Sequence, residues 1–390
     1  MARERIVSGA ADAAEEDQVN WSLRPRCLAE YIGQPSLVEK LRIAIAAAKM
    51  RREPMEHVLL HGPPGLGKTT LAHIIAGEMT TKLHLTSGPA LTRAGDLVGV
   101  LTKLAPGDVL FIDEIHRLPA AVEEFIYPAM EDFRIDVNVD SGMHARSITI
   151  RLKPFTLIGA TTRTGLISGP LRSRFGMAHH LTFYSEHDLL TIVRRSAGLL
   201  GVGCPEGDAA FLGLARRSRG TPRIANRLLR RVRDYAQVHG SAKGRTSARL
   251  PRGSVDAALI NDALTLEGVD TLGLDELDRT YLKVIGTTYQ GGPVGLEAIA
   301  ATMGDDAQTL EDVVEPFLLQ IGFLARTRRG RQLTPDGAKY IGATPPRSAP
   351  DNEPSPDVQT RLFGQPPAAA PTRPADSVAA PTNLRSAFRK

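Results

Sequence analysis

One segment, GPPGLGKT at residues 62–69, constrains the fold more than any other part of the chain. It follows a short apolar segment at 57–61 that predicts a strand, and it precedes a predicted helix at 70–78. In this context the match is a P-loop, whose glycines let backbone N–H groups turn toward a phosphate at the N-terminus of the helix. The segment therefore predicts a parallel α/β sheet that binds a nucleotide.

Within this loop, each residue type has a chemical role. Gly65 and Gly67 let the backbone surround the phosphates, and Lys68 has the length and charge to reach the β- and γ-phosphates. The hydroxyl of Thr69 can ligate Mg²⁺. The loop thus predicts ATP/ADP and Mg²⁺ as cofactors.

A second apolar segment, VLFIDE at 109–114, ends in two carboxylates. At the end of such a strand, Asp113 would hold Mg²⁺ through its water shell, and Glu114 would polarise the attacking water. A buried strand with a polar turn after it is the alternative if the segment is taken alone. Together with the P-loop, the segment predicts an ATP hydrolase.

Two further positions extend this catalytic set. The predicted strand 156–160 leads into Thr161, whose hydroxyl can orient the hydrolytic water near the γ-phosphate. The segment 169–176, GPLRSRFG, carries Arg172 and Arg174. Isolated arginines are usually surface residues, but after a P-loop such arginines reach the γ-phosphate of a neighbouring subunit. We therefore expect Arg174 to act across a subunit interface of a ring.

The chain divides into three predicted blocks between two extensions without a core. Residues 23–183 alternate strands with helices and contain an inserted β-hairpin at about 135–152, whereas residues 184–265 are helical. Residues 266–341 combine short helices with a strand-turn-strand pattern that holds four arginines. Disordered extensions are expected at 1–22 and in the Pro/Ala-rich tail 342–390.

Composition excludes several classes of protein. The two cysteines share no motif, so neither a disulfide framework nor a zinc site is supported. No run of about 18 apolar residues predicts a membrane span, and the start of the chain lacks a secretory apolar region. We expect a cytoplasmic protein. The net charge of +5 is concentrated in basic clusters near 216–233 and 326–331, which suit phosphate or nucleic acid.

The order of these motifs resembles the AAA+ class, and longer segments resemble the RuvB family of Holliday-junction branch-migration ATPases. The resemblance extends from about residue 20 to residue 341. It is carried by such segments as LRPRCLAEYIGQ (23–34), EEFIYPAMEDFRIDV (123–137), RGTPRIANRLLRRVRDYA (219–236) and EPFLLQIGFLARTRRGR (315–331). It implies an AAA+ P-loop domain, a small helical lid domain and a C-terminal winged-helix domain.

The resemblance also implies roles for individual residues. An adenine pocket is implied for Leu23 and Arg24, and phosphate and magnesium contacts are implied for Gly65, Lys68, Thr69 and Thr70. A place near the nucleotide or the subunit interface is implied for Asp132, Phe133 and Arg134. The residues implied to complete the ATP site are Arg174, as an arginine finger, Tyr184 and Arg223. DNA contacts are implied for Arg326 and Arg331.

The resemblance further implies a homohexameric ring that moves the double-stranded arms of a Holliday junction during recombination, DNA repair and the SOS response. Its implied partners are a RuvA-type junction-binding protein, which contacts the hairpin 135–152, and a RuvC-type resolvase. A different class of function remains as an alternative, namely an AAA+ loader or switch that binds DNA or protein without translocating. A transcription activator is disfavoured because no sigma-contact loop is found.

Overall fold

The computed structural model describes residues 21–138, 147–205, 207–239 and 254–343. The predicted disordered extensions at 1–22 and 342–390 therefore lie outside the described residues, except for 342–343 and for residues 21–22, which are helical and correct the predicted boundary. The tip of the predicted hairpin, at 140–144, also lies outside the described residues. Within the described part of the chain, no helix is long and apolar enough to cross a membrane.

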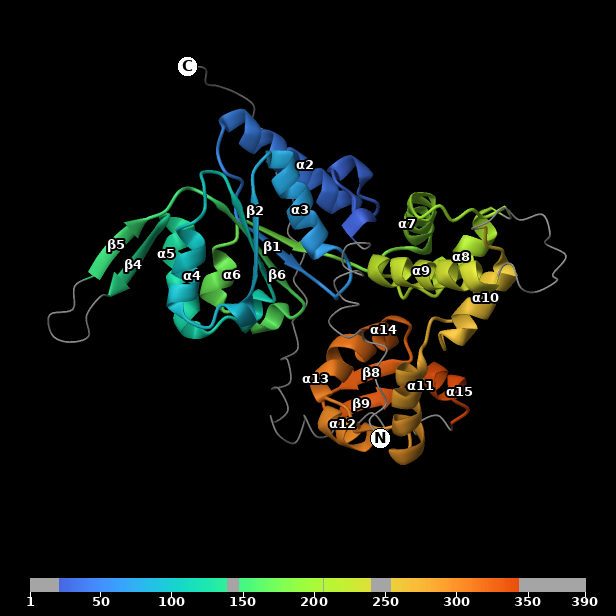
Figure 1. The fold of residues 1–390 in the computed structure, drawn as a ribbon. Coiled ribbons are helices and arrows are strands. Elements are labelled where there is room, and N and C mark those ends of the chain that lie inside the picture. The colour runs from blue at the N-terminus through green and yellow to red at the C-terminus, as the bar shows by residue number, and fades with distance from the viewer. Residues whose placement is uncertain (1–20, 139–146, 206, 240–253, 344–390) are drawn as a thin grey trace, which may run out of the picture. The chain divides into compact units, whose positions relative to one another are not determined.

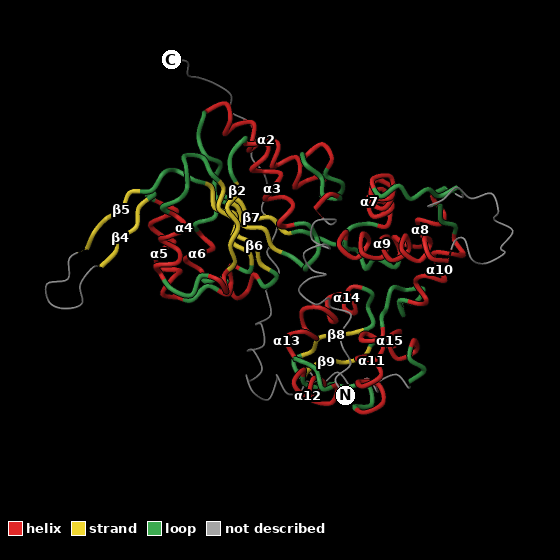
Figure 2. Tube along the Cα trace, in the orientation of Figure 1, coloured by secondary structure: helices red, strands yellow, loops and turns green. Residues whose placement is uncertain are grey.

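The first block contains a five-stranded parallel sheet in the order β2-β3-β6-β1-β7. Its strands are drawn in yellow in Figure 2. This arrangement confirms the predicted parallel α/β fold. Each strand has a partner in register, and β6 lies between the strand before the P-loop and the strand that ends in two carboxylates. The strands are β1 (Val58–His61), β2 (Leu83–Ser87), β3 (Val109–Asp113), β6 (Thr156–Thr161) and β7 (Met177–His180).

Both faces of the sheet are covered by helices (Figure 1). Successive residues of a strand point to opposite faces, so Leu60 packs in the core with α2 and α3 while Leu59 packs in a second core with α4 and α5. Strands buried on both faces are largely apolar, as residues 58–60 of β1, 109–112 of β3 and 157–160 of β6 are. The covering helices are α2 (Pro35–Arg51), α3 (Lys68–Met79), α4 (Ala94–Leu101) and α5 (Ala120–Glu131), with the short helix α6 (Gly169–Ser173) beside them.

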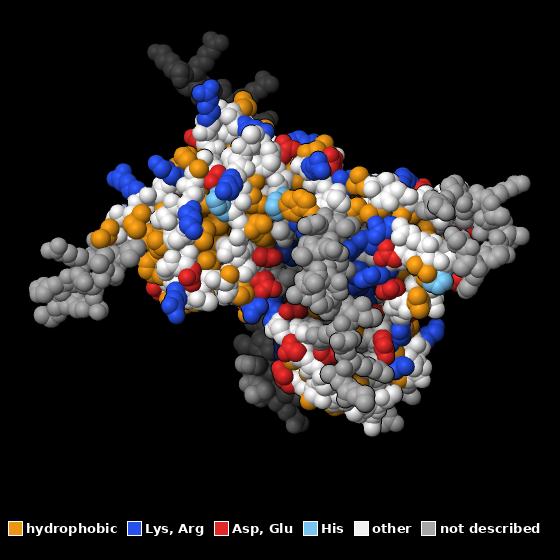
Figure 3. Space-filling model, in the orientation of Figure 1, with side chains coloured by type: hydrophobic (Ala, Val, Ile, Leu, Met, Phe, Trp, Pro, Cys, Tyr) orange, Lys and Arg blue, Asp and Glu red, His pale blue; other side chains and the backbone are white. Residues whose placement is uncertain are grey.

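The predicted β-hairpin is present as the antiparallel pair β4 (Arg134–Asn138) and β5 (Ser147–Arg151). It follows α5 directly and forms a sheet separate from the five-stranded one. Ile148 on β5 is 53% exposed. Figure 3 shows hydrophobic surface along this hairpin and over the adjoining helices α4 and α5. The hairpin thus has an exposed apolar side chain, Ile148, whereas Ile135 on β4 is buried.

The second block is helical and shares one apolar core with the α2–α3 face of the sheet. Gly220 has φ +68° and a following proline starts the longest of these helices, because proline is well suited to the first helical turn. The helices are α7 (Glu186–Leu199), α8 (Asp208–Arg216), α9 (Pro222–His239) and α10 (Ala257–Leu266).

The third block has its own apolar core and forms a winged helix. A π-helical turn at Leu310–Val314 joins two helical segments, so Pro316 lies in the first turn of the second segment. The helices are α11 (Glu276–Lys283), α12 (Leu296–Met303), α13 (Ala307–Thr309), α14 (Glu315–Gln320) and α15 (Pro335–Tyr340), and the wing consists of β8 (Leu324–Thr327) and β9 (Gly330–Leu333). The strand-turn-strand pattern predicted for this block is therefore present.

Candidate nucleotide-binding site

The P-loop connects β1 to α3 with a backbone that glycine adopts readily. Gly62, Gly65 and Gly67 have φ values of +140°, +80° and +96°. A Cβ atom on Gly62 would lie 2.4 Å from the carbonyl oxygen of Leu181, so a larger residue does not fit there. Helix α3 begins at Lys68, two residues before the predicted start, and its N-terminal N–H groups therefore belong to the loop.

Lys68 is buried, and its ammonium group donates to carbonyl oxygens of the same loop. Nζ lies 2.8 Å from the oxygen of Gly62 and 2.9 Å from that of Pro63. Burial lowers the pKa of Lys68 to about 8, and the nearby carboxylate of Asp113 opposes this change. A poorly solvated cation beside a helix N-terminus is a site for an anion, so these residues fit the phosphates of a nucleotide.

At the end of β3, the two predicted carboxylates have different surroundings. The backbone N–H of Glu114 donates to Oδ1 of Asp113 at 3.0 Å. Glu114 has φ +47°, a conformation that non-glycine residues rarely adopt. It lies between the end of β3 and a short 3-10 helix at Ile115–Arg117. Its carboxylate accepts a hydrogen bond from Arg117 at 2.9 Å.

Thr161 ends β6 between the P-loop strand and the carboxylate strand. It is fully buried, and its Oγ1 lies 2.9 Å from Nδ1 of His116 and accepts from the N–H of Arg163 at 2.9 Å. Burial lowers the pKa of His116, which favours the neutral ring. His116 is not among the residues predicted from the sequence, although its place two residues after Glu114 is a usable signal.

Two tyrosines hold the outer side of the P-loop. The hydroxyl groups of Tyr31 and Tyr184 lie 2.8 Å apart, and both donate to the carbonyl oxygen of Leu66. Burial raises the pKa of Tyr184 to about 12, so this phenol stays protonated and donates. The structure thus brings the predicted Tyr184 to the loop and adds Tyr31, which the sequence did not indicate.

Arg223 also lies beside the P-loop, in the first turn of α9. A Cβ atom built on Gly65 would be 3.4 Å from the Cβ of Arg223. The charge of Arg223 contributes to the lowered pKa of Lys68, after burial and the opposing effect of Asp113. Two cations beside one glycine loop fit a polyanionic ligand.

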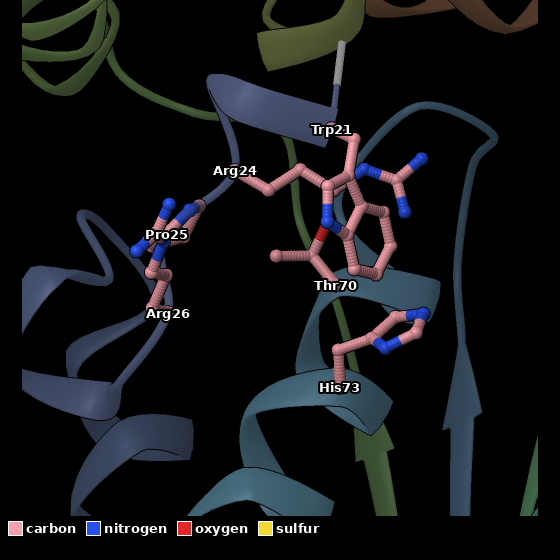
Figure 4. A pocket seen from close by; sticks show the side chains of 6 residues that line it. All are labelled: Trp21, Arg24, Pro25, Arg26, Thr70 and His73. Carbon is pink, nitrogen blue, oxygen red and sulfur yellow. The ribbon is translucent and has the colours of Figure 1, made fainter. Parts of the chain in front are cut away.

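A cavity of about 260 Å³ adjoins α3 (Figure 4). Trp21 and His73 meet edge to face with ring centroids 4.4 Å apart, and the guanidinium of Arg24 lies 5.1 Å from the centroid of the Trp21 ring. The predicted Arg24 and Thr70 line this cavity together with Trp21, Pro25, Arg26 and His73. The predicted Leu23 does not line it. Its side chain is buried, and its carbonyl oxygen accepts from Arg195 at 2.7 Å.

The predicted interface residues form a group on the α5 side of the sheet. Arg174 contacts Glu131, with Nε 3.1 Å from Oε1, and Arg134 pairs with Asp132 at 3.2 Å. Phe133 has φ +49° and packs its ring against Phe155. These residues lie at the start of β4 and the end of α6, so the structure brings them together.

The wing arginines are of two kinds. Arg326 and Arg331 pair with Glu315, which is fully buried in α14, through Nε contacts of 2.8 Å each. Arg328 and Arg329 are exposed at the turn between β8 and β9. The two arginines implied by the resemblance are therefore partly engaged within the domain, whereas the two at the turn are accessible.

Comparison with known proteins covers all three blocks. The family model for the Holliday junction DNA helicase RuvB P-loop domain matches residues 23–181, the RuvB AAA lid domain matches 184–270, and the RuvB C-terminal winged helix domain matches 271–342. The chain belongs to the RuvB family. The predicted family and the predicted AAA+, lid and winged-helix fold are thereby confirmed.

Individual relatives in this family cover most of the chain. The Holliday junction branch migration complex subunit RuvB of Desulfosudis oleivorans is 55% identical over 87% of this chain and 98% of its own length. The subunit of the same name from Latilactobacillus sakei is 54% identical over 88% of this chain and 98% of its own length. The solved structure of the Thermotoga maritima RuvB Holliday junction branch migration motor matches with a TM-score of 0.74 and 50% identity, over 83% of this chain and all of that one.

Proposed function

We propose that this chain is an ATP-hydrolysing motor that drives branch migration of Holliday junctions. The observation that carries the proposal is the convergence of Lys68, Asp113 and Thr161 at the carboxyl ends of three neighbouring strands, in a chain whose three domains all match the RuvB family. Curated relatives at 54–55% identity are named branch migration complex subunits, which supports the same function here.

The P-loop side of the site is assigned to the nucleotide. Lys68 exchanges its carbonyl partners for the β- and γ-phosphates, and Thr70 and Arg24 lie at the cavity beside α3. The hydroxyl of Thr69 and, through water, the carboxylate of Asp113 are proposed to hold Mg²⁺, which would neutralise charge on the phosphates. Tyr184 and Arg223, at the start of the lid domain and within it, lie against the P-loop at Leu66 and Gly65.

Hydrolysis requires a base and an oriented water. Glu114 is proposed as the base, and Thr161 as the residue that orients the water. Arg117 donates to Oε2 of Glu114, whose side chain is 43% exposed. The other carboxylate oxygen can therefore accept a hydrogen bond from water.

Arg174 is proposed as an arginine finger that acts on the nucleotide of the neighbouring subunit in a homohexameric ring. Its contacts are with Tyr127, Glu131 and Pro170, all outside its own P-loop. Asp132 and Phe133 adjoin it and are proposed to share the interface. The finger supplies positive charge to the transferred phosphoryl group.

DNA and protein partners are assigned to the remaining surfaces. The wing is proposed to contact the phosphates of double-stranded DNA, which positions a protein without reading sequence. The hairpin β4–β5, with its exposed Ile148, is proposed to contact a RuvA-type junction-binding protein. We also propose that a RuvC-type resolvase is a partner of this chain and that the protein is cytoplasmic.

A subunit-mixing experiment tests the shared ATP site. Lys68→Ala should abolish ATP turnover because its P-loop loses the buried cation. Arg174→Ala should lower turnover about a thousandfold, to a small residual rate, because the finger is lost. When the two variants are mixed, interfaces that join an intact P-loop to an intact finger should recover turnover.

The control is Arg42→Ala, which removes an arginine of α2 that is 60% exposed and has no assigned role, and should leave turnover near that of the wild type. Near-normal ATPase activity of Lys68→Ala would contradict the assignment of the nucleotide site. Absence of recovery in every mixture would contradict the role of Arg174 across the interface.

A further inference from the structure

The helix that leads to Arg174 is fastened to α5 at its beginning. Ser168 is the N-cap of α6, and its Oγ accepts from the N–H of Leu171 at 3.2 Å. The same hydroxyl donates to the carboxylate of Glu123 on α5. Tyr127, one helical turn further along α5, donates to that carboxylate as well, at 2.5 Å. The start of α6 is therefore tied to α5 through one shared carboxylate.

The end of α6 is fastened to the same helix. The guanidinium carbon of Arg174 lies 4.3 Å from the ring centroid of Tyr127, within the range of a cation–π contact. Nε of Arg174 lies 3.1 Å from Glu131, one turn beyond Tyr127, at ion-pair distance without hydrogen-bond alignment. Nη1 donates to the carbonyl oxygen of Pro170 at 2.7 Å. The guanidinium is thus held from three sides.

The contacts with Tyr127 and Glu131 limit the conformational freedom of the Arg174 side chain. A free arginine populates many rotamers, so an arginine that must reach a phosphate loses conformational entropy when it is ordered. Tyr127 and Glu131 restrict Arg174 before a ligand arrives, which reduces that loss. Among the described residues, Nη2 of Arg174 has no hydrogen-bond partner, so this end of the fork is available to an oxyanion.

We propose that Tyr127 and Glu131 are positioning residues that hold the finger Arg174 ready for the nucleotide of the neighbouring subunit, Tyr127 through its ring face and Glu131 through its charge. The inference rests on the proposed role of Arg174. It adds that the reactivity of one subunit's P-loop depends on an aromatic ring in the next subunit. Tyr127 and Glu131 act through Arg174 and do not contact the nucleotide themselves.

The test is a double-mutant cycle in the full-length protein, with steady-state ATP turnover as the readout. Tyr127→Leu removes the ring and should lower kcat about tenfold to a hundredfold, the effect of misplacing a catalytic group, with little change in KM. Tyr127→Phe keeps the ring face and should lower kcat less than about threefold, since the cation–π contact remains. In the Arg174→Ala background, Tyr127→Leu should have no further effect.

Subunit mixing provides a readout that a merely structural role would not change. Tyr127→Leu subunits have an intact P-loop, so adding Lys68→Ala subunits, whose finger is intact, should restore their turnover. Phe125→Leu is the matched control, because it exchanges another partly buried aromatic ring on α5 and should leave kcat near the wild-type value. Glu131→Gln, at a side chain that is 55% exposed, tests the charge with little risk to folding and should lower kcat about threefold.

Three results would overturn the proposal. The first is an equal loss of kcat from Tyr127→Leu in the wild-type and Arg174→Ala backgrounds, which would mean that the ring acts independently of the finger. The second is an absence of restoration in mixed rings. The third is a Glu131→Gln variant that is indistinguishable from the wild type. A fully active Arg174→Ala variant would instead contradict the proposed role of Arg174 as the arginine finger. The failure of that role is therefore distinguishable from the failure of the positioning role of Tyr127 and Glu131.

Discussion

Glu315→Gln should destabilise the winged-helix domain. In the wild type this carboxylate is fully buried and accepts hydrogen bonds from Tyr281 at 2.6 Å, from Arg331 at 2.8 Å and from Arg326 at 2.8 Å. Glutamine has the same shape, but it carries no charge and turns one acceptor into an N–H₂ group that faces these donors. Two arginines would then lose their buried counter-ion.

The size of the effect follows from the burial of each partner. Removing one member of a buried ion pair costs about 3–5 kcal/mol, because the remaining charge is left uncompensated. The side chain of Arg331 is 18% exposed, so its pair with Glu315 is close to a buried ion pair. The side chain of Arg326 is 43% exposed, and its pair contributes less because water screens the charges. Both arginines also keep a longer contact with the partly buried Glu311, at 3.6 Å for Arg326 and 3.4 Å for Arg331. We therefore expect a loss at the lower end of this range, about 3 kcal/mol.

Hydrogen exchange of the β8–β9 amides measures this loss locally, which suits a chain of several domains. Protection of the wing amides should fall about a hundredfold at neutral pH, while the amides of β1 and β3 keep their protection.

Burial alone would raise the pKa of Glu315, but its hydrogen bonds to Arg331 and Tyr281 and the charge of Arg326 lower this pKa below the usual 4.5.

The sign of the pH dependence follows from this lowered pKa. The stabilisation by Glu315 is present above pH 4.5 and is lost as the pH falls through the lowered pKa. The difference between wild type and Glu315→Gln should therefore shrink in acid. Unchanged wing protection in the variant at neutral pH would refute the reasoning.

Two further predictions concern DNA contact and catalysis. Arg328→Ala combined with Arg329→Ala should weaken DNA binding and reduce the slope of log K against log salt by about two, without changing wing protection. An unchanged slope would remove the turn from the DNA interface. Thr161→Val keeps the side-chain shape but removes the hydroxyl bonded to His116, so kcat should fall at least tenfold with little change in KM. A normal kcat would contradict the water-orienting role.

The sequence predicted the parallel sheet and the P-loop because the chemistry there is local. Phosphate binding by Lys68 needs a fixed spacing within a strand-turn-helix unit, and that spacing is visible in one short segment. The strand that ends at Asp113 is identified in the same way, from its apolar run and its terminal carboxylates. The fold class and the family followed from such segments and are confirmed.

Other parts of the site depend on packing between distant segments. Tyr31 and Tyr184 meet over the P-loop although 153 positions separate them, and nothing in either segment indicates the contact. The side chain of Leu23 is buried in the core, so of the two residues predicted for the adenine pocket Arg24 lines the cavity and Leu23 does not. In the wing, the pairing of arginines with Glu315 depends on the burial of one carboxylate, which a basic sequence pattern does not reveal.

Branch migration of a synthetic four-way junction tests the central claim most directly. With a RuvA-type junction-binding protein present, the wild-type chain should move the junction only while ATP is hydrolysed. The Lys68→Ala variant, and a non-hydrolysable ATP analogue with the wild type, should leave the junction in place. Normal ATP turnover by the wild type without movement of the junction would contradict the motor and favour a loader or switch.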